Sequence, residues 1–169
     1  RLKNMAIGAL LHDIGLIYIP MDIQQVNMDT CSDVVQKEVK RHVIYGYSAV
    51  EKESWLPMAA KDIIVNHHER MDGSGYPFRL NGEKISLETK TVSLCDEFDS
   101  MVYGHCRNKR KIKETMDYIT SQAGVKFDFK VVQTFISSVA VYPIGTIVVL
   151  STGEKGIVIR QNSSLPTYP

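Results

Sequence analysis

Apolar residues recur along most of the chain at the three- and four-residue intervals of amphipathic helices. A first helix is predicted over residues 2–14, with a stop at Gly15, from the positions Leu2, Met5, Ala6, Ala9, Leu10 and Ile14. A second, capped by Ser32-Asp33 and running to about Ser54, is predicted from Val35, Val39, Ile44, Tyr47 and Val50. Further helices are predicted over about 57–69, 87–102, 112–122 and 128–139, and the glycine-rich segment 70–86 is predicted to be a loop.

The pattern changes after residue 140. Val141–Leu150 is rich in β-branched residues, Ser151–Glu154 contains a glycine turn, and Gly156–Arg160 alternates apolar and polar positions, which predicts a β-hairpin. The polar tail over residues 161–169 is expected to be loosely ordered. The predicted fold class is therefore all-α, with a helical domain over residues 1–139 and a small β-hairpin appendage over residues 140–169.

The composition narrows the class of protein. The 169 residues include 20 basic and 19 acidic side chains, and the net charge of +1 excludes a strongly basic nucleic-acid binder, so no DNA partner is expected. Three scattered cysteines without a CxxC pair favour a reducing, cytoplasmic setting. No apolar run approaches the roughly 18 residues of a membrane span. Because the chain opens on Arg1 in helix-like sequence, we expect a fragment that lacks its N-terminal part.

Two pairs of adjacent residues carry metal-binding chemistry. His12 and Asp13 can reach one point only near a helix end or around a large ligand such as a dinuclear metal site, because helical neighbours point about 100° apart. The alternative is an ordinary surface or capping pair. His67 and His68 each follow an isoleucine by four positions, so both imidazoles continue a predicted buried face. Metal coordination would satisfy the ring nitrogens of two such neighbours directly.

His42 and Asp96 complete a candidate ligand set. His42 lies beside two valines on an amphipathic helix, and Asp96 interrupts an apolar run, where a carboxylate is costly unless it is paired or bound to metal. An ion pair is the alternative for Asp96. The full set is His12, Asp13, His42, His67, His68 and Asp96. Such mixed nitrogen and oxygen donors favour Fe, Mn or Zn over Ca or Mg, and a metal that lowers the pKa of water suits phosphoester hydrolysis.

The motifs around these residues resemble those of a known family. Residues 12–15, HDIG, are similar to the signature of the HD superfamily of metal-dependent phosphohydrolases. Residues 67–77, HHERMDGSGYP, resemble the HHExxDGxGYP signature of its HD-GYP subfamily. Residues 41–46 and 96–101 resemble the RHxxxG and ADxFDAL segments, and the similarity extends from residue 5 to about residue 139.

The resemblance implies an HD-domain helical bundle from bacterial signalling that hydrolyses cyclic di-GMP to linear pGpG, in some members on to GMP, through a metal-bridged hydroxide. It implies two or three divalent metal ions, Fe or Mn rather than Zn, held by the six residues above with Asp13 as the bridge. Catalytic roles would fall to His12, Asp13 and Asp99, and substrate contacts to Tyr76, Gly73 and Gly75. A diguanylate cyclase-type (GGDEF) partner would contact the loop around Tyr76, and an upstream sensor or receiver domain is expected.

Three positions depart from the family pattern. Leu16 replaces a lysine, and His105 and Asn108 replace arginines. Arg107 and Arg110 could take over phosphate binding, although a solvated, basic start of the next helix is the alternative. Each lost cation would weaken phosphate binding by about 1.5–3 kcal/mol. Two other functions therefore stay open: a weak or inactive regulatory module that binds a nucleotide or partner protein, and a phosphohydrolase acting on another nucleotide.

Overall fold

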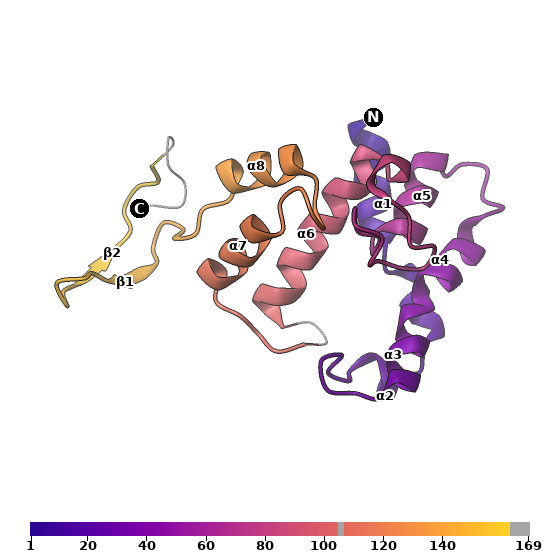
Figure 1. Cartoon of the computed structure of the whole chain (residues 1–169), viewed down its shortest axis with the longest axis horizontal. Coiled ribbons are helices and arrows are strands. Elements are labelled where there is room, and N and C mark those ends of the chain that lie inside the picture. Colours follow the sequence, from indigo (N-terminus) through magenta and orange to yellow (C-terminus); the bar gives the residue numbers. More distant parts are fainter. Residues whose placement is uncertain (105–106, 163–169) are drawn as a thin grey trace.

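The computed structural model describes residues 1–104 and 107–162 and confirms a mainly helical chain with a small two-stranded sheet near its C-terminal end (Figure 1). The α-helices are α1 (Leu2–Leu11), α2 (Met21–Gln24), α3 (Asp33–Lys40), α4 (His42–Val50), α5 (Met58–Asn66), α6 (Leu87–Tyr103), α7 (Ile112–Ser121) and α8 (Phe129–Ser138). Two short 3-10 helices are η1 (Ile14–Tyr18) and η2 (Gly82–Lys84). In the described residues, no helix is both long and apolar enough to cross a membrane.

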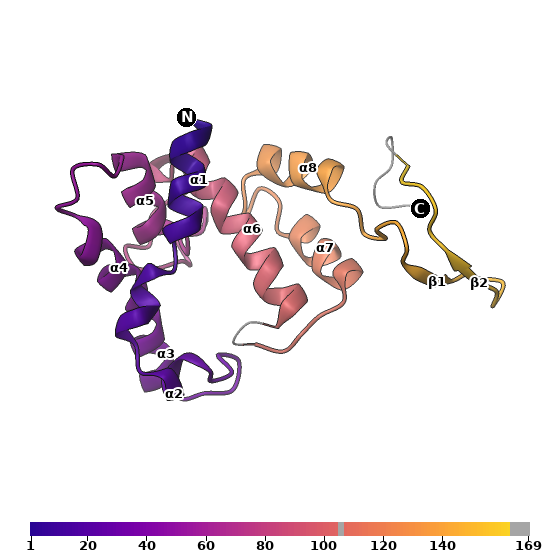
Figure 2. The same cartoon turned by 180° about the vertical axis from the view of Figure 1, so that it is seen from behind.

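The long helix α6 runs through the middle of the helical part. In both views, α1, α4 and α5 lie on one side of α6, and α7 and α8 lie on the other (Figure 1 and Figure 2). Each side has its own apolar cluster. The first is formed by Val50, Leu56, Ala60 and Ile64, and the second by Leu94, Ile119, Phe127, Val131 and Val132. Helix α6 packs against helices on both sides and so joins the two clusters.

Polar caps fix the starts of three helices. The side chains of Ser32, Ser86 and Asp128 each accept a hydrogen bond from a backbone N–H in the first turn of α3, α6 and α8. These bonds satisfy donors that have no partner inside the helix. The predicted caps at Ser32 and Asp128 are thus present, and α6 ends at Gly104 in the left-handed conformation with φ of 73°.

The first predicted helix is too long, and the role predicted for its stop residue is wrong. Helix α1 ends at Leu11, and the chain turns through the next two residues into η1. Gly15 does not stop a helix but is buried within η1, against the backbone of α4. A Cβ atom on Gly15 would overlap the carbonyl oxygen of His42 and lie 2.5 Å from the backbone nitrogen of Gly46. The glycine is therefore required by close packing between two segments.

The apolar stripe of α1 also lies differently from the prediction. Leu2 and Leu10 are 74% and 85% exposed. Instead, Gly8 is buried, and Ile7 and Leu11 pack against the first apolar cluster. A Cβ on Gly8 would come within 3 Å of Ile63 on α5, so the two helices approach too closely for a side chain there.

The second predicted helix is two helices. The chain bends at Arg41, whose N–H bonds to the carbonyls of Glu38 and Val39, and α4 ends at Val50 rather than near residue 54. The next helix, predicted over 57–69, ends at Asn66. Because the helices begin and end at these positions, two histidines lie at helix ends: His42 begins α4, and His67 is the C-cap residue of α5. The remaining helices, predicted over 87–102, 112–122 and 128–139, agree with α6, α7 and α8 to within one residue at each end.

The predicted hairpin is present but shorter than expected. Strands β1 (Ile147–Val149) and β2 (Lys155–Ile157) pair antiparallel, with Ile147 opposite Ile157. The hairpin lies apart from the helices in both views (Figure 1 and Figure 2). Most of its large apolar side chains are exposed, among them Ile147, Val149, Ile157 and Ile159. The expected loose tail lies outside the described residues from position 163 onward.

The close approach at Gly15 gives a stability prediction. Gly15→Ala should lower the free energy of unfolding by about 3 kcal/mol, because the new methyl group must push η1 away from α4. Urea unfolding followed by circular dichroism measures this. Gly156→Ala is the matched control: its Cβ would meet only a Val148 side-chain atom at 3.8 Å, so a change within about 0.5 kcal/mol is expected. Equal stability of Gly15→Ala and the wild type would contradict the packing argument.

Candidate metal centre

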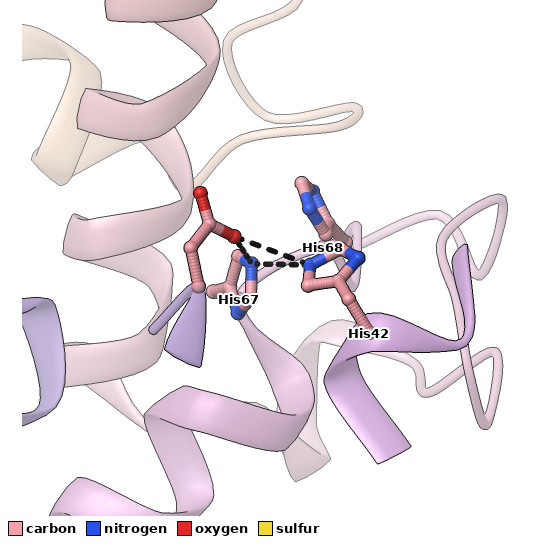
Figure 3. Close-up of side chains that lie close together, drawn as sticks. His42, His67 and His68 are labelled. Carbon is pink, nitrogen blue, oxygen red and sulfur yellow. Dashed lines mark hydrogen bonds and ion pairs between the residues drawn. The ribbon is translucent and has the colours of Figure 1, made fainter. Parts of the chain in front are cut away.

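Six side chains from four helical segments converge at one place in the helical part. His12 and Asp13 lie in the turn between α1 and η1, and His42 is the first residue of α4. His67 and His68 follow the last residue of α5, and Asp96 lies in the middle of α6. These are the six residues that the sequence analysis selected. Figure 3 shows His42, His67 and His68 with their rings gathered together.

The first group of ligand atoms combines three imidazoles with one carboxylate. Atoms of Asp13, His42, His67 and His68 lie within 4.8 Å of one another. The Oδ1 atom of Asp13 is 3.2 Å from Nε2 of His42 and 3.5 Å from Nε2 of His67. His42 and His67 are buried, with side chains only 3% and 0% exposed. The group is therefore held in rigid, packed surroundings.

A second group shares Asp13 with the first. His12, Asp13 and Asp96 also bring ligand atoms within 4.8 Å of one another. Here the other carboxylate oxygen, Oδ2 of Asp13, is 3.2 Å from Nε2 of His12, and Oδ1 of Asp96 is 3.7 Å from the same nitrogen. The two oxygens of Asp13 thus face two different groups. This is the geometry that a carboxylate bridging two cations requires.

The hydrogen bonds of the imidazoles show that these donors fit a metal. Nδ1 of His42 donates to the carbonyl of Val39 at 2.8 Å, and Nδ1 of His67 donates to the carbonyls of Ile63 and Ile64 at 3.2 and 3.1 Å. Because a carbonyl can only accept, each Nδ1 carries a proton, and in a neutral imidazole of this tautomer Nε2 is the acceptor. The two Nε2 atoms nevertheless lie 3.4 Å apart and face the Asp13 carboxylate. A cation among these acceptors would satisfy all of them.

His12 has a similar Nδ1 hydrogen bond, but its Nε2 faces two carboxylates, Asp13 and Asp96, which favour the protonated ring. Its Nδ1 donates to the carbonyl of Ala9 at 2.6 Å. Burial alone would lower the pKa of His12, but hydrogen bonds to Asp13 and Asp96 raise it to about 10. Burial likewise opposes ionisation of Asp13, yet the imidazoles of His12, His42 and His67 hold the pKa of this carboxyl well below its usual range. The Asp13 carboxylate therefore remains ionised and attracts cations.

The loop after His68 closes over one side of the centre. The ring of Tyr76 stacks on the ring of His68, with centroids 4.7 Å apart and planes 25° apart, and burial raises the pKa of the Tyr76 phenol. Gly73 has φ of 75°, and a Cβ on Gly75 would lie 2.5 Å from the backbone at residues 68–70. Both glycines are therefore needed for the path of the loop itself.

A buried carboxylate that the sequence analysis did not assign holds this loop in place. Glu69 is 2% exposed, and its two oxygens accept hydrogen bonds from the backbone N–H groups of Phe78 at 2.6 Å and Leu80 at 2.9 Å. Its place in the HHExxDGxGYP-like motif, directly after the histidine pair, is the sequence signal that points to it. Glu69 positions the loop, and hence Tyr76, against the imidazoles.

A network of two arginines and one glutamate lies next to the centre. Glu97, next to Asp96 on α6, accepts hydrogen bonds from Arg70 at 2.8 Å and from Arg107 at 2.9 Å. Burial would lower the pKa of Arg107, but the nearby carboxylates of Glu97, Asp29 and Asp96 raise it. Arg107, a predicted substrate contact, is thus close enough to the candidate ligand Asp96 to feel its charge but is already bound to Glu97.

The other predicted residues lie outside the two ligand groups. Arg110 stacks its guanidinium over the ring of Tyr118 on α7, at 5.7 Å. Asp99 is an exposed residue of α6, one turn after Asp96. Leu16 is half-buried in η1, and Asn108 binds the side chain of Asn27 at 3.1 Å. His105 lies outside the described residues.

Comparisons with known proteins found a matching family profile and several similar proteins. The sequence profile of the HD domain family matches residues 1–131. Over 161 residues the chain is 30% identical to the cyclic di-GMP phosphodiesterase PA4108 of Pseudomonas aeruginosa, covering 95% of this chain and 38% of the relative. It is 35% identical over 144 residues to the cyclic di-GMP phosphodiesterase response regulator RpfG of Xanthomonas campestris, covering 80% of this chain and 36% of the relative.

A solved structure has the same fold. Bd1817, an HDG"Y"P protein from Bdellovibrio bacteriovorus, superposes with a TM-score of 0.65 at 23% identity, over 77% of this chain and 41% of the other. The chain thus spans only about two fifths of that protein and less than two fifths of the two enzymes above.

The shared carboxylate gives a prediction for metal binding. Asp13→Ala should reduce the metal content after loading with Mn²⁺ more than about tenfold, because both ligand groups lose a member and even outer-shell changes cost 10–100-fold in affinity. Elemental analysis by mass spectrometry measures the bound metal. Asp99→Ala, on α6 outside both groups, should retain it. Full metal occupancy in Asp13→Ala would exclude the bridging geometry.

The buried glutamate gives a prediction for the loop. In Glu69→Gln, one of the two backbone N–H groups would face an amide NH₂ instead of an oxygen, which should cost about 2 kcal/mol of stability. Hydrogen exchange of the Phe78 and Leu80 amides should become faster. Glu83→Gln, at an exposed position, should change neither quantity. Unchanged exchange in Glu69→Gln would show that the carboxylate does not hold the loop.

Proposed function

This chain belongs to the HD domain family, and we propose that it hydrolyses cyclic di-GMP to linear pGpG, as its HD-GYP motifs predict. The observation that carries the proposal is the Asp13 carboxylate, which faces two ligand groups with its two oxygens. The names of the relatives support the substrate, since PA4108 and RpfG are both cyclic di-GMP phosphodiesterases. The helical part up to about residue 139 would be the catalytic domain, and residues 140–169 an appendage without a catalytic role.

We propose that the two ligand groups hold two divalent cations, Fe or Mn in preference to Zn, with Asp13 between them. His42, His67 and His68 would bind the first and His12 and Asp96 the second. Lewis acidity and a water molecule of lowered pKa are what such ions supply when bound, and both assist attack on phosphorus. The chain's own contribution is to orient the Nε2 atoms of His12, His42 and His67 toward the centre through the hydrogen bonds of their Nδ1 atoms. The buried imidazoles also keep bulk water from one side of the centre.

Substrate binding would use the loop at Tyr76 and the cation at Arg107. Tyr76 presents an aromatic ring beside His68, where a guanine base or the ribose could pack, and Gly73 and Gly75 give the loop its close path. Arg107 would give positive charge near Asp96, with Glu97 fixing its direction. Arg110, stacked on Tyr118, would act only after a rotation of its side chain. The absence of a cation at Leu16 and Asn108 favours weak substrate binding.

We also propose a cellular location and partner domains for this catalytic domain. A cytoplasmic location suits the cyclic dinucleotide substrate and the scattered cysteines. A GGDEF domain could dock on the Tyr76 loop, where Phe78 is 58% exposed. Because the relatives are more than twice as long as this chain, an additional sensor or receiver domain would control the activity.

Turnover of cyclic di-GMP tests the proposal. The chain is loaded with Mn²⁺ or, without oxygen, with Fe²⁺, incubated with cyclic di-GMP and followed by chromatography. We expect pGpG to form, and we expect Asp13→Ala to abolish it because both ligand groups lose a member. Binding without turnover for either metal would overturn catalysis in favour of a regulatory module. Turnover of another cyclic dinucleotide in place of cyclic di-GMP would overturn the substrate but not the phosphodiesterase chemistry.

A further inference from the structure

We propose that Lys40 is a substrate-binding residue that contacts the second phosphate of the cyclic dinucleotide, the one that is not cleaved. This inference rests on the proposed function. It concerns a residue outside the motifs that carry the family resemblance and outside both ligand groups. The observation behind it is the position of the Lys40 ammonium over the ring of Tyr76.

Lys40 is placed beside the metal centre by the bend between two helices. It is the last residue of α3, two positions before the ligand His42, and its side chain is half-buried. Its Nζ atom lies 5.5 Å from the centroid of the Tyr76 ring, within the range of a cation–π contact. Tyr76 also stacks on His68, so Lys40 and a candidate ligand imidazole contact the same aromatic ring.

The neighbouring cations are already bound to carboxylates. Arg70 and Arg107 both bind Glu97, and Arg41 binds Glu38 at 3.1 Å. Within the part of the chain that the structure describes, no carboxylate lies at ion-pair distance from Lys40. A half-buried ammonium whose contact is an aromatic face remains able to bind an anion, and a phosphate can approach it without first breaking a salt bridge.

The position of Lys40 indicates which phosphate it would meet. The scissile group must lie at the ligand atoms of Asp13 and the imidazoles, whereas the Lys40 ammonium lies over the Tyr76 ring of the loop and belongs to neither ligand group. Cyclic di-GMP has two phosphodiester groups, so one can react while the other lies beside the loop. A substrate with a single phosphodiester has no second phosphate that could bind Lys40. Lys40 should therefore raise affinity for the dinucleotide selectively.

Helix α3 offers a matched control. Lys37 lies one turn before Lys40 in the last turn of the same helix and is exposed. Both lysines interact favourably with the C-terminal end of the helix dipole. If Lys40 only stabilised α3, Lys37→Gln and Lys40→Gln would have similar effects. Lys40→Arg keeps the charge and should retain most of the binding.

The test measures kcat and KM of the Mn²⁺-loaded chain for cyclic di-GMP and for bis(p-nitrophenyl) phosphate, which has one phosphodiester. For Lys40→Gln we expect KM for cyclic di-GMP to rise about tenfold, equivalent to about 1.4 kcal/mol, with little change in kcat. KM for the small substrate and the metal content should stay within about twofold of the wild type. Lys40→Arg should restore KM to within about threefold, and Lys37→Gln should behave as the wild type.

The outcomes separate this inference from the proposed function. If the wild type cleaves cyclic di-GMP and Lys40→Gln leaves KM unchanged, only the role of Lys40 is overturned. The same holds if Lys40→Gln raises KM equally for cyclic di-GMP and for bis(p-nitrophenyl) phosphate. If the wild type binds cyclic di-GMP without cleaving it, the proposed function fails, and calorimetry then tests Lys40: a tenfold weaker Kd in Lys40→Gln supports it, and an equal Kd overturns it. If the wild type does not bind cyclic di-GMP at all, both fail.

Discussion

The helical part of this protein is organised around the carboxylate of Asp13. Its Oδ1 atom faces His42 and His67, and its Oδ2 atom faces His12. Such a carboxylate can lie among three imidazoles only if the turn after α1 and the ends of α4 and α5 come within hydrogen-bond distance of one another. The close packing of Gly15 against the backbone at His42 and Gly46 is what allows this approach. Metal chemistry and helix packing thus depend on the same few contacts.

This constraint explains where the helices end. An imidazole inside a regular helix points along one face, but the three that face Asp13 lie at the end of α1, the start of α4 and the end of α5. In each of the three, Nδ1 bonds to a carbonyl three or four residues earlier, so the helix end itself fixes the ring orientation. Carbonyl groups in the last turns of α1, α3 and α5 thus orient the rings of the candidate metal ligands.

Buried charge outside the ligand groups is balanced locally. Glu69 is satisfied by two backbone N–H groups and Glu97 by Arg70 and Arg107, so neither carboxylate competes for the cations of the centre. The resulting arrangement leaves few free positive charges near the ligand atoms. It agrees with the near-neutral composition of the chain, and it distinguishes Lys40, at ion-pair distance from no carboxylate of the described residues, from the paired Arg41, Arg70 and Arg107.

The sequence by itself determined the fold class and the family, and it selected the six candidate ligands that the structure brings together. Helical periodicity, capping residues and adjacent histidines are local features, and the motifs at residues 12–15 and 67–77 are specific enough to identify the chemistry. Only the tertiary structure decided which oxygen of Asp13 faces which group, why Gly15 must be glycine, and that Glu69 and Lys40 lie at the Tyr76 loop. These relations join residues far apart in the chain, and they are set by how α1, α3, α4 and α5 pack, which no local pattern specifies.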